Sequence, residues 1–590
     1  MRRLLSCLAT GALALTGLGV TVATAPPAAA ATAAASGTFN VLSYNVAGLP
    51  EILSSASTDR ETSTTAIGQR IASYDVVHVE EDFNYHAYLY AGDTSHAYRT
   101  PTSGGAGIGS GLNTLSKISY DEDDFERVGW NSCQWDSGDC LTPKGFTFMR
   151  ERLAEGVYVD FYNLHTNAGT NDGDLASRAD NLNQLTAFIQ SHSAGNAVVV
   201  MGDTNTRYTR SGDTIAEFAA TNGLTDAWVK NIRGGVAPVK GSDALVCDQT
   251  GATVPNTCEV VDKILYRGNG FVTLDSTSYN NEHAKFLESG TGLMLSDHDP
   301  ITASFTWKTN PAFQFSDQFG GPHGDYFTDA AGVPWGAQAT RISLRAGDRV
   351  DQVAVTLSNG TTLTHGGTGG TASSLTLGST EYVTSAYLCQ GKYNNTTRIF
   401  YAKFTTSLGR TLVGGSTTSD CVTRNAPAGW QIAGFHGRTG DELDKVGLIY
   451  TPNDFMLVNR ATGKCLDVNN WSADDGANVQ LWTCAGGANQ RWRIEPLGDG
   501  TSRIVSTVSD KVLDVNDCGT SDGTNIQQWT WWDNACQRWT LTDTDSGWLR
   551  LTNPNSGKVA DVADCAGADG TDVRLWTWLN NSCQQWQAVA

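Results

Sequence analysis

The end of the sequence repeats a pattern every 47 residues. The tripeptides QRW, QRW and QQW begin at positions 490, 537 and 584, and the tetrapeptides CLDV, VLDV and VADV precede them at the same interval. Three units of one internal repeat therefore fill residues 455–590. A unit of this size cannot bury a core alone, so the three units must pack against one another.

Each unit also has a tryptophan fifteen residues after its aspartate. A carboxylate accepts hydrogen bonds from sugar hydroxyls and an aromatic ring stacks on a sugar face, although a purely structural role is the alternative. The Q-x-W tryptophans are expected in the core. Residues 455–590 resemble a ricin B-type β-trefoil lectin. That resemblance assigns sugar contacts to Asp467, Trp482 and Asn489 in the first unit, to Asp514 and Trp529 in the second, and to Asp561 and Trp576 in the third. Cysteines 536 and 583 replace Asn489 in the later units.

Residues 313–450 are rich in Gly, Thr and Ser, which indicates an all-β domain. The stretch RVDQVAVTLSNGTTLTHGG alternates apolar and polar residues about an Asn-Gly pair, as in a β-hairpin. With FGGPHGDYF and IAGFHGRTGDELDKVGLIY, it resembles a jacalin-type β-prism lectin. In that family a G-x-x-x-D loop holds a hexose, and the resemblance assigns this role to Gly440 and Asp444. Asp441 and Glu442 replace aromatic residues there, so a spacer or protein-contact domain is the alternative.

The 590 residues exceed the roughly 250–300 residues of a single core, so about three domains are expected. Residues 1–35 combine two arginines, an apolar stretch and an Ala-rich tail, which predicts a secretory signal peptide and an extracellular protein. Apart from Cys7, the cysteines form neighbouring pairs that predict six local disulfides, with metal binding as the alternative. The pairs are Cys133 and Cys140, Cys247 and Cys258, Cys389 and Cys421, Cys465 and Cys484, Cys518 and Cys536, and Cys565 and Cys583.

Residues 38–306 contain apolar runs that end in polar residues, namely TFNVLSYNV, YDVVHVEED, VYVDFYNLH, NAVVVMGD and VVDKILY. A helical pattern puts Leu175, Leu182, Leu185 and Ile189 on one face. Buried strands alternating with helices predict a layered α/β domain whose polar residues gather at strand ends. These polar residues are Asn45, Glu81, His165, Asp203, Asn205, Asp262, Asp297 and His298.

These residue types together suit metal-assisted hydrolysis. Carboxylates and an amide form a hard-oxygen set suited to Mg²⁺ or Ca²⁺, and such an ion neutralises a phosphoryl oxygen. A histidine held by a carboxylate deprotonates water near neutral pH, so His298 in SDHDP is predicted to be the base. Taken singly, Asn45 has the alternative role of a turn cap and Glu81 that of a solvated acid. Their joint occurrence favours a site.

The motifs SYNVAGLP, VEEDF, NLHT, GDTN, VDKILY and SDHDP resemble those of the endonuclease/exonuclease/phosphatase superfamily, in the same order. The resemblance implies an α/β four-layer sandwich for residues 38–306. It assigns Mg²⁺, or another hard divalent ion such as Ca²⁺ or Mn²⁺, to Asn45, Glu81 and Asp297. It assigns phosphate contacts to His165 and Asn205, orientation or activation of the nucleophile to Asp203, the role of base to His298 and the role of partner of that base to Asp262. Glu80 stands where that family commonly has glutamine.

Within the superfamily, CQWDSGDCLTPKGFTFMR at 133–150 resembles secreted bacterial sphingomyelinases, which implies a phosphodiester lipid headgroup as substrate. The net charge of −21 does not assist binding to nucleic acid, which is the less favoured partner. Peripheral membrane contact is expected, although the sequence shows no aromatic hairpin suited to insertion.

We therefore predict a secreted metal-dependent phosphodiesterase, similar to sphingomyelinases and phospholipases C, that two lectin modules target to glycans. The alternatives are an extracellular nuclease of the same superfamily and a lectin with an inactive catalytic domain.

Overall fold

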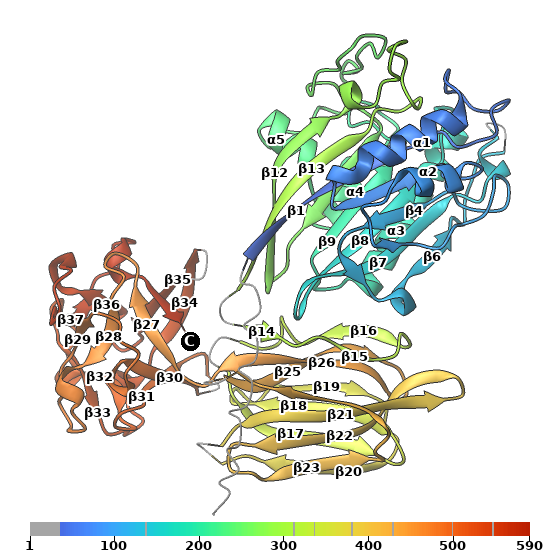
Figure 1. Cartoon of the computed structure of the whole chain (residues 1–590). Coiled ribbons are helices and arrows are strands. Elements are labelled where there is room, and N and C mark those ends of the chain that lie inside the picture. The colour runs from blue at the N-terminus through green and yellow to red at the C-terminus, as the bar shows by residue number, and fades with distance from the viewer. Residues whose placement is uncertain are drawn as a thin grey trace, which may run out of the picture. The chain divides into compact units, whose positions relative to one another are not determined.

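The structure is a computed structural model of the whole chain. It describes residues 36–589 except 136–137, 311–312, 335–336, 379–380, 428–429, 498 and 546–547. The predicted signal peptide, residues 1–35, lies outside the described residues. An N-terminal α/β part is followed by two β-rich parts (Figure 1), as the sequence predicts. Each part is described on its own.

Two sheets form the centre of the N-terminal part. In spatial order, the first contains β12 (Val272–Asn281), β13 (Ile301–Thr309), β1 (Ser36–Asn45), β2 (Val76–Glu80), β4 (Asn113–Ser116) and β3 (Tyr98–Arg99). The second contains β10 (Thr225–Asp226), β11 (Asp262–Arg267), β9 (Val198–Asp203), β8 (Val157–His165), β7 (Gly145–Ala154) and β5 (Ser119–Tyr120), with β6 (Glu126–Gly129) paired to β7. Valine-rich strands such as β9 are buried along their whole length, as strands covered on both faces must be.

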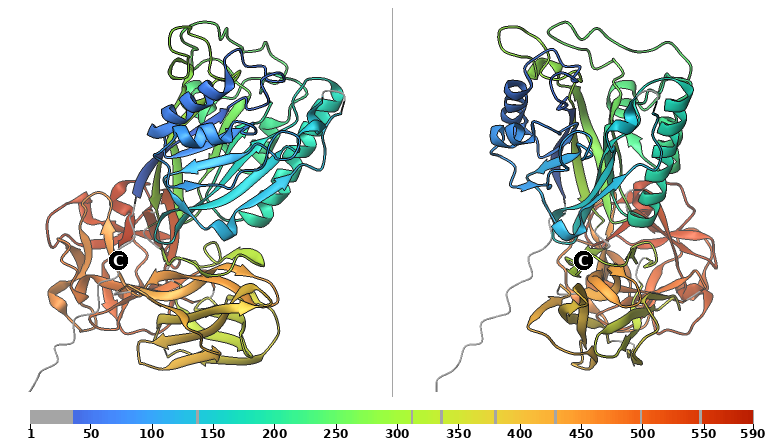
Figure 2. Two further views of the ribbon diagram at one scale, coloured as in Figure 1. Left: turned by 45° about the vertical axis from the view of Figure 1, so that its right-hand side comes forward. Right: turned by 90° about the vertical axis from the view of Figure 1, so that its right-hand side faces the viewer.

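Helices cover the outer faces of these sheets. The helices are α1 (Arg60–Arg70), α2 (His86–Gly92), α3 (Asp172–His192), α4 (Ile215–Thr221) and α5 (Ala227–Arg233). In the right-hand view of Figure 2, α1 and α2 lie on one side of the strands and α3 on the other. The predicted apolar face of α3 is buried at Leu182, Leu185 and Ile189, whereas Leu175 is half-buried. Within the described residues, no helix is both long and apolar enough to cross a membrane.

Many strands begin or end at the same end of the two sheets, which is here called the loop edge. The strands β1 and β2 run parallel and end there, as do β8 and β9. The strands β4, β7, β11 and β13 run antiparallel to them and begin there. The segments that leave or enter these eight strand ends therefore share one end of the domain.

The middle part consists of three antiparallel sheets. The first contains β14 (Gln314–Phe315), β26 (Leu443–Pro452), β25 (Trp430–Thr439) and β16 (Asp325–Thr328), with β15 (Phe319–Gly320) paired to β26. The second contains β19 (Thr362–Gly366), β18 (Val350–Leu357), β17 (Ala339–Ala346) and β20 (Thr371–Thr376). The third contains β23 (Thr411–Gly415), β22 (Thr396–Thr406), β21 (Val383–Tyr393) and β24 (Asp420–Asn425). The Asn-Gly pair joins β18 to β19 as a hairpin, which agrees with the sequence pattern.

The C-terminal part repeats one four-stranded unit three times. The strands are β27 (Phe455–Asn459), β28 (Cys465–Val468), β29 (Val479–Trp482), β30 (Arg491–Pro496), β31 (Ser502–Ser506), β32 (Val512–Val515), β33 (Ile526–Trp529), β34 (Thr540–Asp545), β35 (Trp548–Asn553), β36 (Lys558–Val562), β37 (Val573–Trp576) and β38 (Trp586–Val589). The Q-x-W tryptophans are fully buried, and each donates its indole N–H to a backbone carbonyl. The three bonds are Trp492 to Leu466 O at 3.0 Å, Trp539 to Leu513 O at 2.9 Å and Trp586 to Ala560 O at 3.1 Å.

One aspartate per unit links each unit to the next and closes the ring. Asp475 accepts hydrogen bonds from the backbone N–H of Thr530, at 2.7 Å, and from Lys511, at 2.6 Å, both in the second unit. Asp522 makes the same contacts with the third unit. Asp569 makes them with Thr483 and Lys464 of the first unit. The repeat therefore fixes both the cores and the joints between units.

Six disulfides connect the twelve cysteines in the neighbouring pairs that the sequence predicts. Two of them, Cys133–Cys140 and Cys247–Cys258, lie in loops at the loop edge. The other four lie in the β-rich parts. Bridges of this kind stabilise loops that have little core of their own.

Substitution of Trp539 by Ala should lower the free energy of unfolding of the C-terminal part by about 3–5 kcal/mol, because a fully buried indole leaves a cavity. Calorimetry of the full chain measures this loss. The matched control is Trp532→Ala in the same unit, where the side chain is exposed and the expected change is about 0.5 kcal/mol or less. Equal losses in the two variants would contradict the assignment of the Q-x-W tryptophans to the core.

Candidate active site

Three predicted catalytic residues stand side by side on adjacent strands. His165 is the last residue of β8 and pairs in register with Asp203, the last residue of β9. Asp262, the first residue of β11, pairs with Asp203 from the other side. His165 Nε2 lies 3.3 Å from Asp203 Oδ2, and all three side chains are buried. Asn205 donates its backbone N–H to Asp203 Oδ1 at 3.0 Å.

Two residues of the first sheet reach this group from the opposite side. Asn45, at the end of β1, donates Nδ2 to Glu81 Oε1 and to Asp203 Oδ2, each at 3.2 Å. The second bond joins the two sheets at the site. Glu81 has a φ of 56° and Asn205 a φ of 50°, a left-handed conformation that is rare outside glycine and is often found at functional sites.

His298 completes the group from the segment that precedes β13. Its Nδ1 lies 3.1 Å from Asp262 Oδ2, and its Nε2 lies 3.7 Å from Asp203 Oδ2. A proton on Nδ1 can be donated to Asp262, which leaves Nε2 to accept a proton from a substrate or water. Asp297, the preceding residue, lines one pocket together with His298.

Burial and charge set the protonation states of the group. Burial alone would raise the pKa of Asp203, but His298 and His165 outweigh it and lower this pKa to about 2. Burial opposes a charge on His298, yet Asp262 and Asp203 raise its pKa well above the usual value. Burial lowers the pKa of His165 to about 3, so this ring is neutral. An ionised aspartate therefore sits between one neutral and one basic histidine.

The donor set fits a hard divalent cation. Asp203, Asp262 and His298 place one ligand atom each within 4.8 Å of one another. Asp262 Oδ1 is buried and has no hydrogen-bond partner among the described residues, so an acceptor remains free. The predicted metal residues Asn45 and Glu81 lie beside this cluster instead of within it, and they contact each other. Burial raises the pKa of Glu81; Lys144 opposes the rise and Asp297 adds to it.

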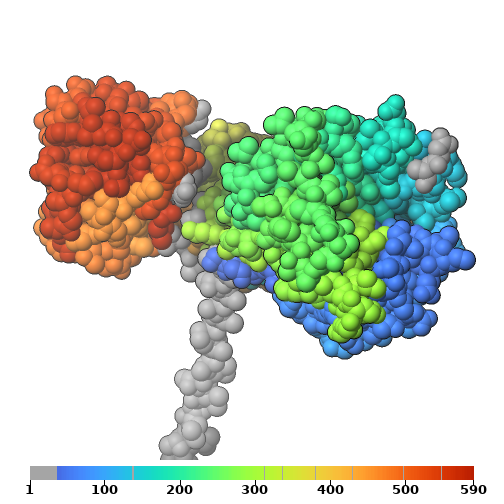
Figure 3. Space-filling view, turned by 90° about the horizontal axis from the view of Figure 1, so that it is seen from above, coloured from blue at the N-terminus to red at the C-terminus, as the bar shows by residue number. Residues whose placement is uncertain are grey.

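A pocket of about 150 Å³ opens next to His298. Its wall includes Arg207 and the loop closed by the Cys247–Cys258 disulfide. Figure 3 looks onto this end of the domain, where green (about 235–260), yellow-green (about 285–300) and blue (about 45–60) segments lie side by side. Two hydrogen bonds confirm the neighbourhood, from Thr58 Oγ1 to Met294 O at 3.1 Å and between His283 Nε2 and Gly251 O at 2.9 Å.

Sequence reasoning missed several residues that hold or charge the site. Lys144 pairs with Asp139 at 2.6 Å and donates to Thr166 O at 3.3 Å, which places a cation beside His165. The sequence signal for Lys144 was the Lys-Gly-Phe sequence that follows the loop closed by the Cys133–Cys140 disulfide, here called the cysteine loop. Ser296 donates its hydroxyl to Asn45 O at 2.6 Å and so fixes the SDHDP segment to the end of β1.

Two further residues position loops around the site. The buried guanidinium of Arg60 donates to Val46 O at 2.8 Å and to Leu295 O at 2.9 Å, which joins the loop after β1 to the loop before β13. His283 Nδ1 lies 2.6 Å from Oδ1 of Asp299, the residue that directly follows the predicted base His298. A buried arginine and a His–Asp pair have no short sequence motif, so neither could be found without the fold.

Glu80, the departure from the family's glutamine, is fully buried at the end of β2. Burial, followed by the charges of Asp262 and Asp203, raises its pKa well above the usual value. Neither carboxyl oxygen has a hydrogen-bond partner among the described residues. A neutral carboxylic acid has nearly the shape of glutamine's amide, so the replacement need not add a charge to the site.

In the middle part, the predicted hexose residues lie in the loop between β25 and β26. The N–H of Gly440 donates to Glu442 O at 3.1 Å. The buried carboxylate of Asp444 forms an ion pair with Arg398, and Glu442 accepts from Arg349 Nε at 2.8 Å. A sugar at this loop would have to compete with ion pairs that the domain already makes.

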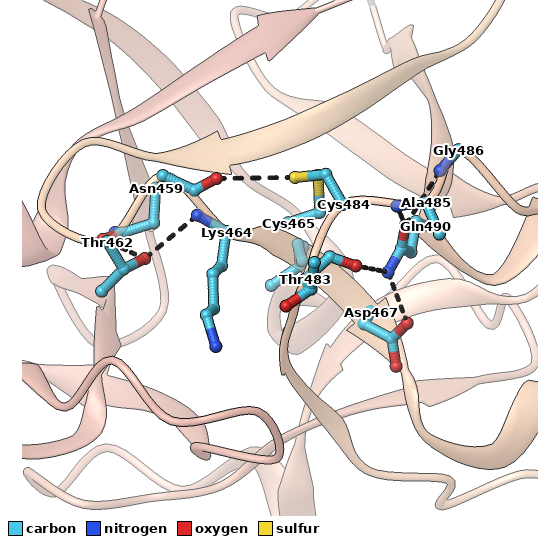
Figure 4. Close-up of a disulfide and its surroundings, with 12 residues drawn as sticks. Asn459, Thr462, Lys464, Cys465, Asp467, Thr483, Cys484, Ala485, Gly486 and Gln490 are labelled. Atoms are coloured by element: carbon cyan, nitrogen blue, oxygen red, sulfur yellow. Dashed lines mark hydrogen bonds between the residues drawn. A yellow bond between two sulfur atoms is a disulfide. The ribbon is translucent and has the colours of Figure 1, made fainter.

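In the first unit of the C-terminal part, Asp467 is already fully engaged. Its carboxylate accepts from Gln480 at 3.1 Å, from Asn489 at 2.6 Å and from Gln490 at 3.1 Å. Figure 4 shows Gln490 between Asp467 and the backbone at Ala485 and Gly486, next to the Cys465–Cys484 disulfide. Trp482 remains exposed beside this network.

The second and third units differ at the corresponding positions. The second has a pocket of about 180 Å³ lined by Asp514, Trp529 and Trp532, whose two rings lie 5.9 Å apart at 71°. In the third unit, Arg574 stands where the second has a glutamine. Its guanidinium lies 4.3 Å over the Trp576 ring and approaches Asp561 to 3.7 Å. The second unit offers an open aromatic pocket, whereas the third covers its own tryptophan.

Three segments of the chain match family models. Residues 46–231 match "Endonuclease/Exonuclease/phosphatase family 2", and residues 316–449 match "Jacalin-like lectin domain". Residues 448–529 and 535–590 match "Ricin-type beta-trefoil lectin domain-like". The three resemblances drawn from the sequence are thereby confirmed.

Known proteins resemble parts of the chain. Sphingomyelinases of Mycobacterium bovis and Mycobacterium tuberculosis are each 42% identical over 276 residues, which is 46% of this chain and 53% of the relative. The chain thus spans about half the length of these curated relatives. Horcolin of Hordeum vulgare is 34% identical over 117 residues, 19% of this chain and 80% of that protein. The crystal structure of the designed three-fold symmetric protein ThreeFoil is 40% identical, covers 23% of this chain and 99% of its own, and has a TM-score of 0.23.

Replacement of Asp262 by Asn should shift the pH dependence of hydrolysis. As the predicted base, His298 must be neutral to accept a proton, so the rate is expected to rise as pH passes its raised pKa. Loss of the Asp262 charge lowers that pKa, so the acid limb of kcat/KM moves to lower pH while kcat falls by roughly 10²-fold. The pH–rate profile on a soluble phosphodiester measures both effects. Asp275→Asn, on the exposed side of β12, is the control, and an unmoved acid limb in Asp262→Asn would contradict the pairing.

Replacement of Trp529 by Ala should weaken glycan binding by roughly tenfold, because a stacking ring is lost from an open pocket. Trp576→Ala is the matched control and should change binding less than twofold, since Arg574 already covers that ring. A glycan array followed by titration of the best ligand measures both. Loss of binding in the Trp576 variant alone would reverse the assignment.

Proposed function

We propose that the chain is a secreted, divalent-metal-dependent phosphodiesterase that hydrolyses lipid headgroups in the manner of a sphingomyelinase or phospholipase C. Residues 38–306 form the catalytic domain, a four-layer α/β sandwich. Residues 313–450 form a jacalin-like β-prism domain and residues 455–590 a ricin B-type β-trefoil, after a signal peptide at 1–35. The observation that carries the proposal is the His298–Asp262–Asp203 arrangement at the loop edge, in a segment 42% identical to sphingomyelinases.

The residues of the chain divide the chemistry between them. Asp262 holds His298 through Nδ1, and Nε2 takes the proton of the attacking water as its oxygen bonds to phosphorus. Asp203, kept ionised by its neighbours, orients that water. His165, neutral at its buried position, and Asn205 contact phosphate oxygens. The bond between phosphorus and the ester oxygen breaks as the new bond forms, and the released alkoxide takes a proton from solvent to become the alcohol.

A metal ion belongs beside this group. Asn45, Glu81 and Asp297 are the residues proposed to hold it, with the free Asp262 Oδ1 available as an additional acceptor. A bound Mg²⁺, Ca²⁺ or Mn²⁺ supplies positive charge to a phosphoryl oxygen. The carboxylates fit a hard oxygen-seeking ion better than zinc.

Glycan binding is proposed mainly for the trefoil. Its second unit has the open aromatic pocket, while the Asp444–Arg398 ion pair favours a weaker or absent site in the jacalin-like domain. Two weakly binding modules on one chain raise the local concentration of the enzyme at a surface. The six disulfides support an extracellular location, where such bridges persist.

Substitution of His298 by Ala should lower turnover by roughly 10²–10⁴-fold without unfolding the domain, because the base is lost. Release of phosphocholine from sphingomyelin and phosphatidylcholine liposomes, with Mg²⁺ and then with EDTA, measures turnover. Plasmid DNA and bis(p-nitrophenyl) phosphate serve as further substrates. His192→Ala is the control, since His192 is the last residue of α3, at the end of that helix opposite the loop edge.

The outcomes separate the alternatives. Headgroup release that requires metal and His298 supports the lipid phosphodiesterase. Cleavage of DNA alone would identify a nuclease, and no hydrolysis of any of these substrates would indicate an inactive domain with lectin function. Near-normal rates in the His298 variant would overturn the mechanism.

A further inference from the structure

Exposed apolar side chains of the N-terminal domain collect at the loop edge. Eleven large apolar residues are exposed in its described part, and two of them, Tyr88 and Tyr98, lie on α2 and β3. The other nine lie in the loops that meet at the loop edge. They are Ile52, Leu53, Ile108, Trp135, Leu141, Val236, Val239, Val246 and Leu293.

Five of these nine, on three loops, form what is here called the apolar rim: Ile52, Leu53, Ile108, Trp135 and Leu141. Their exposed fractions include 93% for Ile52, 82% for Ile108, 70% for Trp135 and 68% for Leu141. Side chains of this size are normally buried, and exposed groups of them mark interaction surfaces. The five side chains are distributed over three segments, those between β1 and α1, between β3 and β4, and between β6 and β7.

Contacts between the loops make the rim continuous. Asn84 donates its N–H to Gly48 O at 3.1 Å, which ties the loop after β2 to the loop that carries Ile52 and Leu53. The N–H of Ala106 donates to Asn84 Oδ1 at 3.4 Å, which adds the loop that carries Ile108. A Cβ placed on Gly107 would lie 3.6 Å from Leu141 O, so the cysteine loop follows next.

The rim borders the catalytic group directly. The N–H of Gly48 donates to the carbonyl of Glu81 at 3.0 Å, and Ala47 donates to Asn45 Oδ1 at 3.0 Å, so the first rim loop starts at the site. At the other end, Lys144 closes the cysteine loop and contacts Thr166 O, next to His165. A surface that touches the rim therefore also faces the catalytic group.

The rim has no surplus of positive charge, in keeping with the net charge of −21 of the chain. The segment PTSGGAGIGSG at 101–111 has no charged residue. In the described part of the cysteine loop, Asp139 is neutralised by Lys144 at 2.6 Å. Glu51, beside Ile52, and Asp59, which caps α1, are exposed acids of the first loop. In the sequence a further acid, Asp136, directly follows Trp135. Without a cationic cluster, the rim has nothing to attract an anionic partner.

We propose that the apolar rim inserts into the surface of a zwitterionic phospholipid bilayer and presents the catalytic group to its headgroups. Exposed apolar side chains spread over three loops suit a fluid lipid surface, which can adapt to each of them, better than the matched groove that a protein partner needs. The proposal rests on the proposed function in taking the lipid as substrate, but bilayer binding itself requires no catalysis. The sequence showed no inserting hairpin because the rim is assembled from loops about 30–55 residues apart.

The test uses the full chain and vesicles of pure phosphatidylcholine, which carry no glycan for the lectin domains. The triple variant Ile108→Ser, Trp135→Ser and Leu141→Ser should bind vesicles at least tenfold more weakly than the wild type in sedimentation assays with EDTA present. Its turnover of soluble bis(p-nitrophenyl) phosphate with Mg²⁺ should stay within twofold, since none of the three residues belongs to the catalytic group. Leu408→Ser is the matched control, because Leu408 is also 68% exposed but lies in the middle part.

Vesicle binding tests the rim, and hydrolysis of the soluble diester tests the proposed activity, so each proposal can be overturned without the other. Equal vesicle binding by the triple variant and the wild type, or no binding by the wild type, overturns the rim proposal even where the soluble diester is hydrolysed. A wild type that binds vesicles through the rim but hydrolyses no diester supports the rim and overturns the proposed activity. Stronger binding to anionic than to zwitterionic vesicles would also count against the rim, since it would require a cationic surface.

Discussion

The buried carboxylate of Asp203 is the interaction on which the site depends. A charge removed from water must be compensated by hydrogen bonds and opposite charge. Asp203 obtains this from its own turn through Asn205, from its own sheet through His165, from the other sheet through Asn45, and from the SDHDP segment through His298. Every element that compensates the charge is thereby brought within reach of the same point. The requirement to stabilise one anion thus positions the catalytic group.

The loop edge concentrates function at one end of a rigid framework. Eight strand ends meet there, and the loops between them are free to vary while the sheets stay fixed. The catalytic group occupies the strand ends, the disulfide loop 247–258 forms a pocket wall, and the apolar rim lies on neighbouring loops. Arg60 and the His283–Asp299 pair hold these loops in place through buried contacts. Chemistry and surface recognition are in this way built on the same edge.

The trefoil separates what a repeat must keep from what it can change. The buried Q-x-W tryptophans and the Asp–Thr–Lys joints recur in all three units, because each is needed to close the ring. The surface positions have diverged, although Gln480, Gln527 and Arg574 occupy equivalent places. In the first unit the carboxylate of Asp467 is fully hydrogen-bonded, in the second a pocket stays open, and in the third Arg574 covers the Trp576 ring. Equal backbones therefore do not imply equal binding.

The sequence by itself determined the order of parts, the repeat, the neighbouring cysteine pairs and which polar residues follow buried strands, because these depend on local spacing and periodicity. It could not determine which of those residues touch. The contact from Asn45 to Asp203 and the position of Lys144 arise from strand register and from contacts between sheets. The family resemblance implied the pairing of Asp262 with His298, but its geometry depends on the same packing. The ion pair that occupies Asp444 and the continuity of the apolar rim also join residues far apart in sequence. Only the tertiary structure decides these contacts, because they depend on which loops packing brings together and not on the residues next to them in the chain.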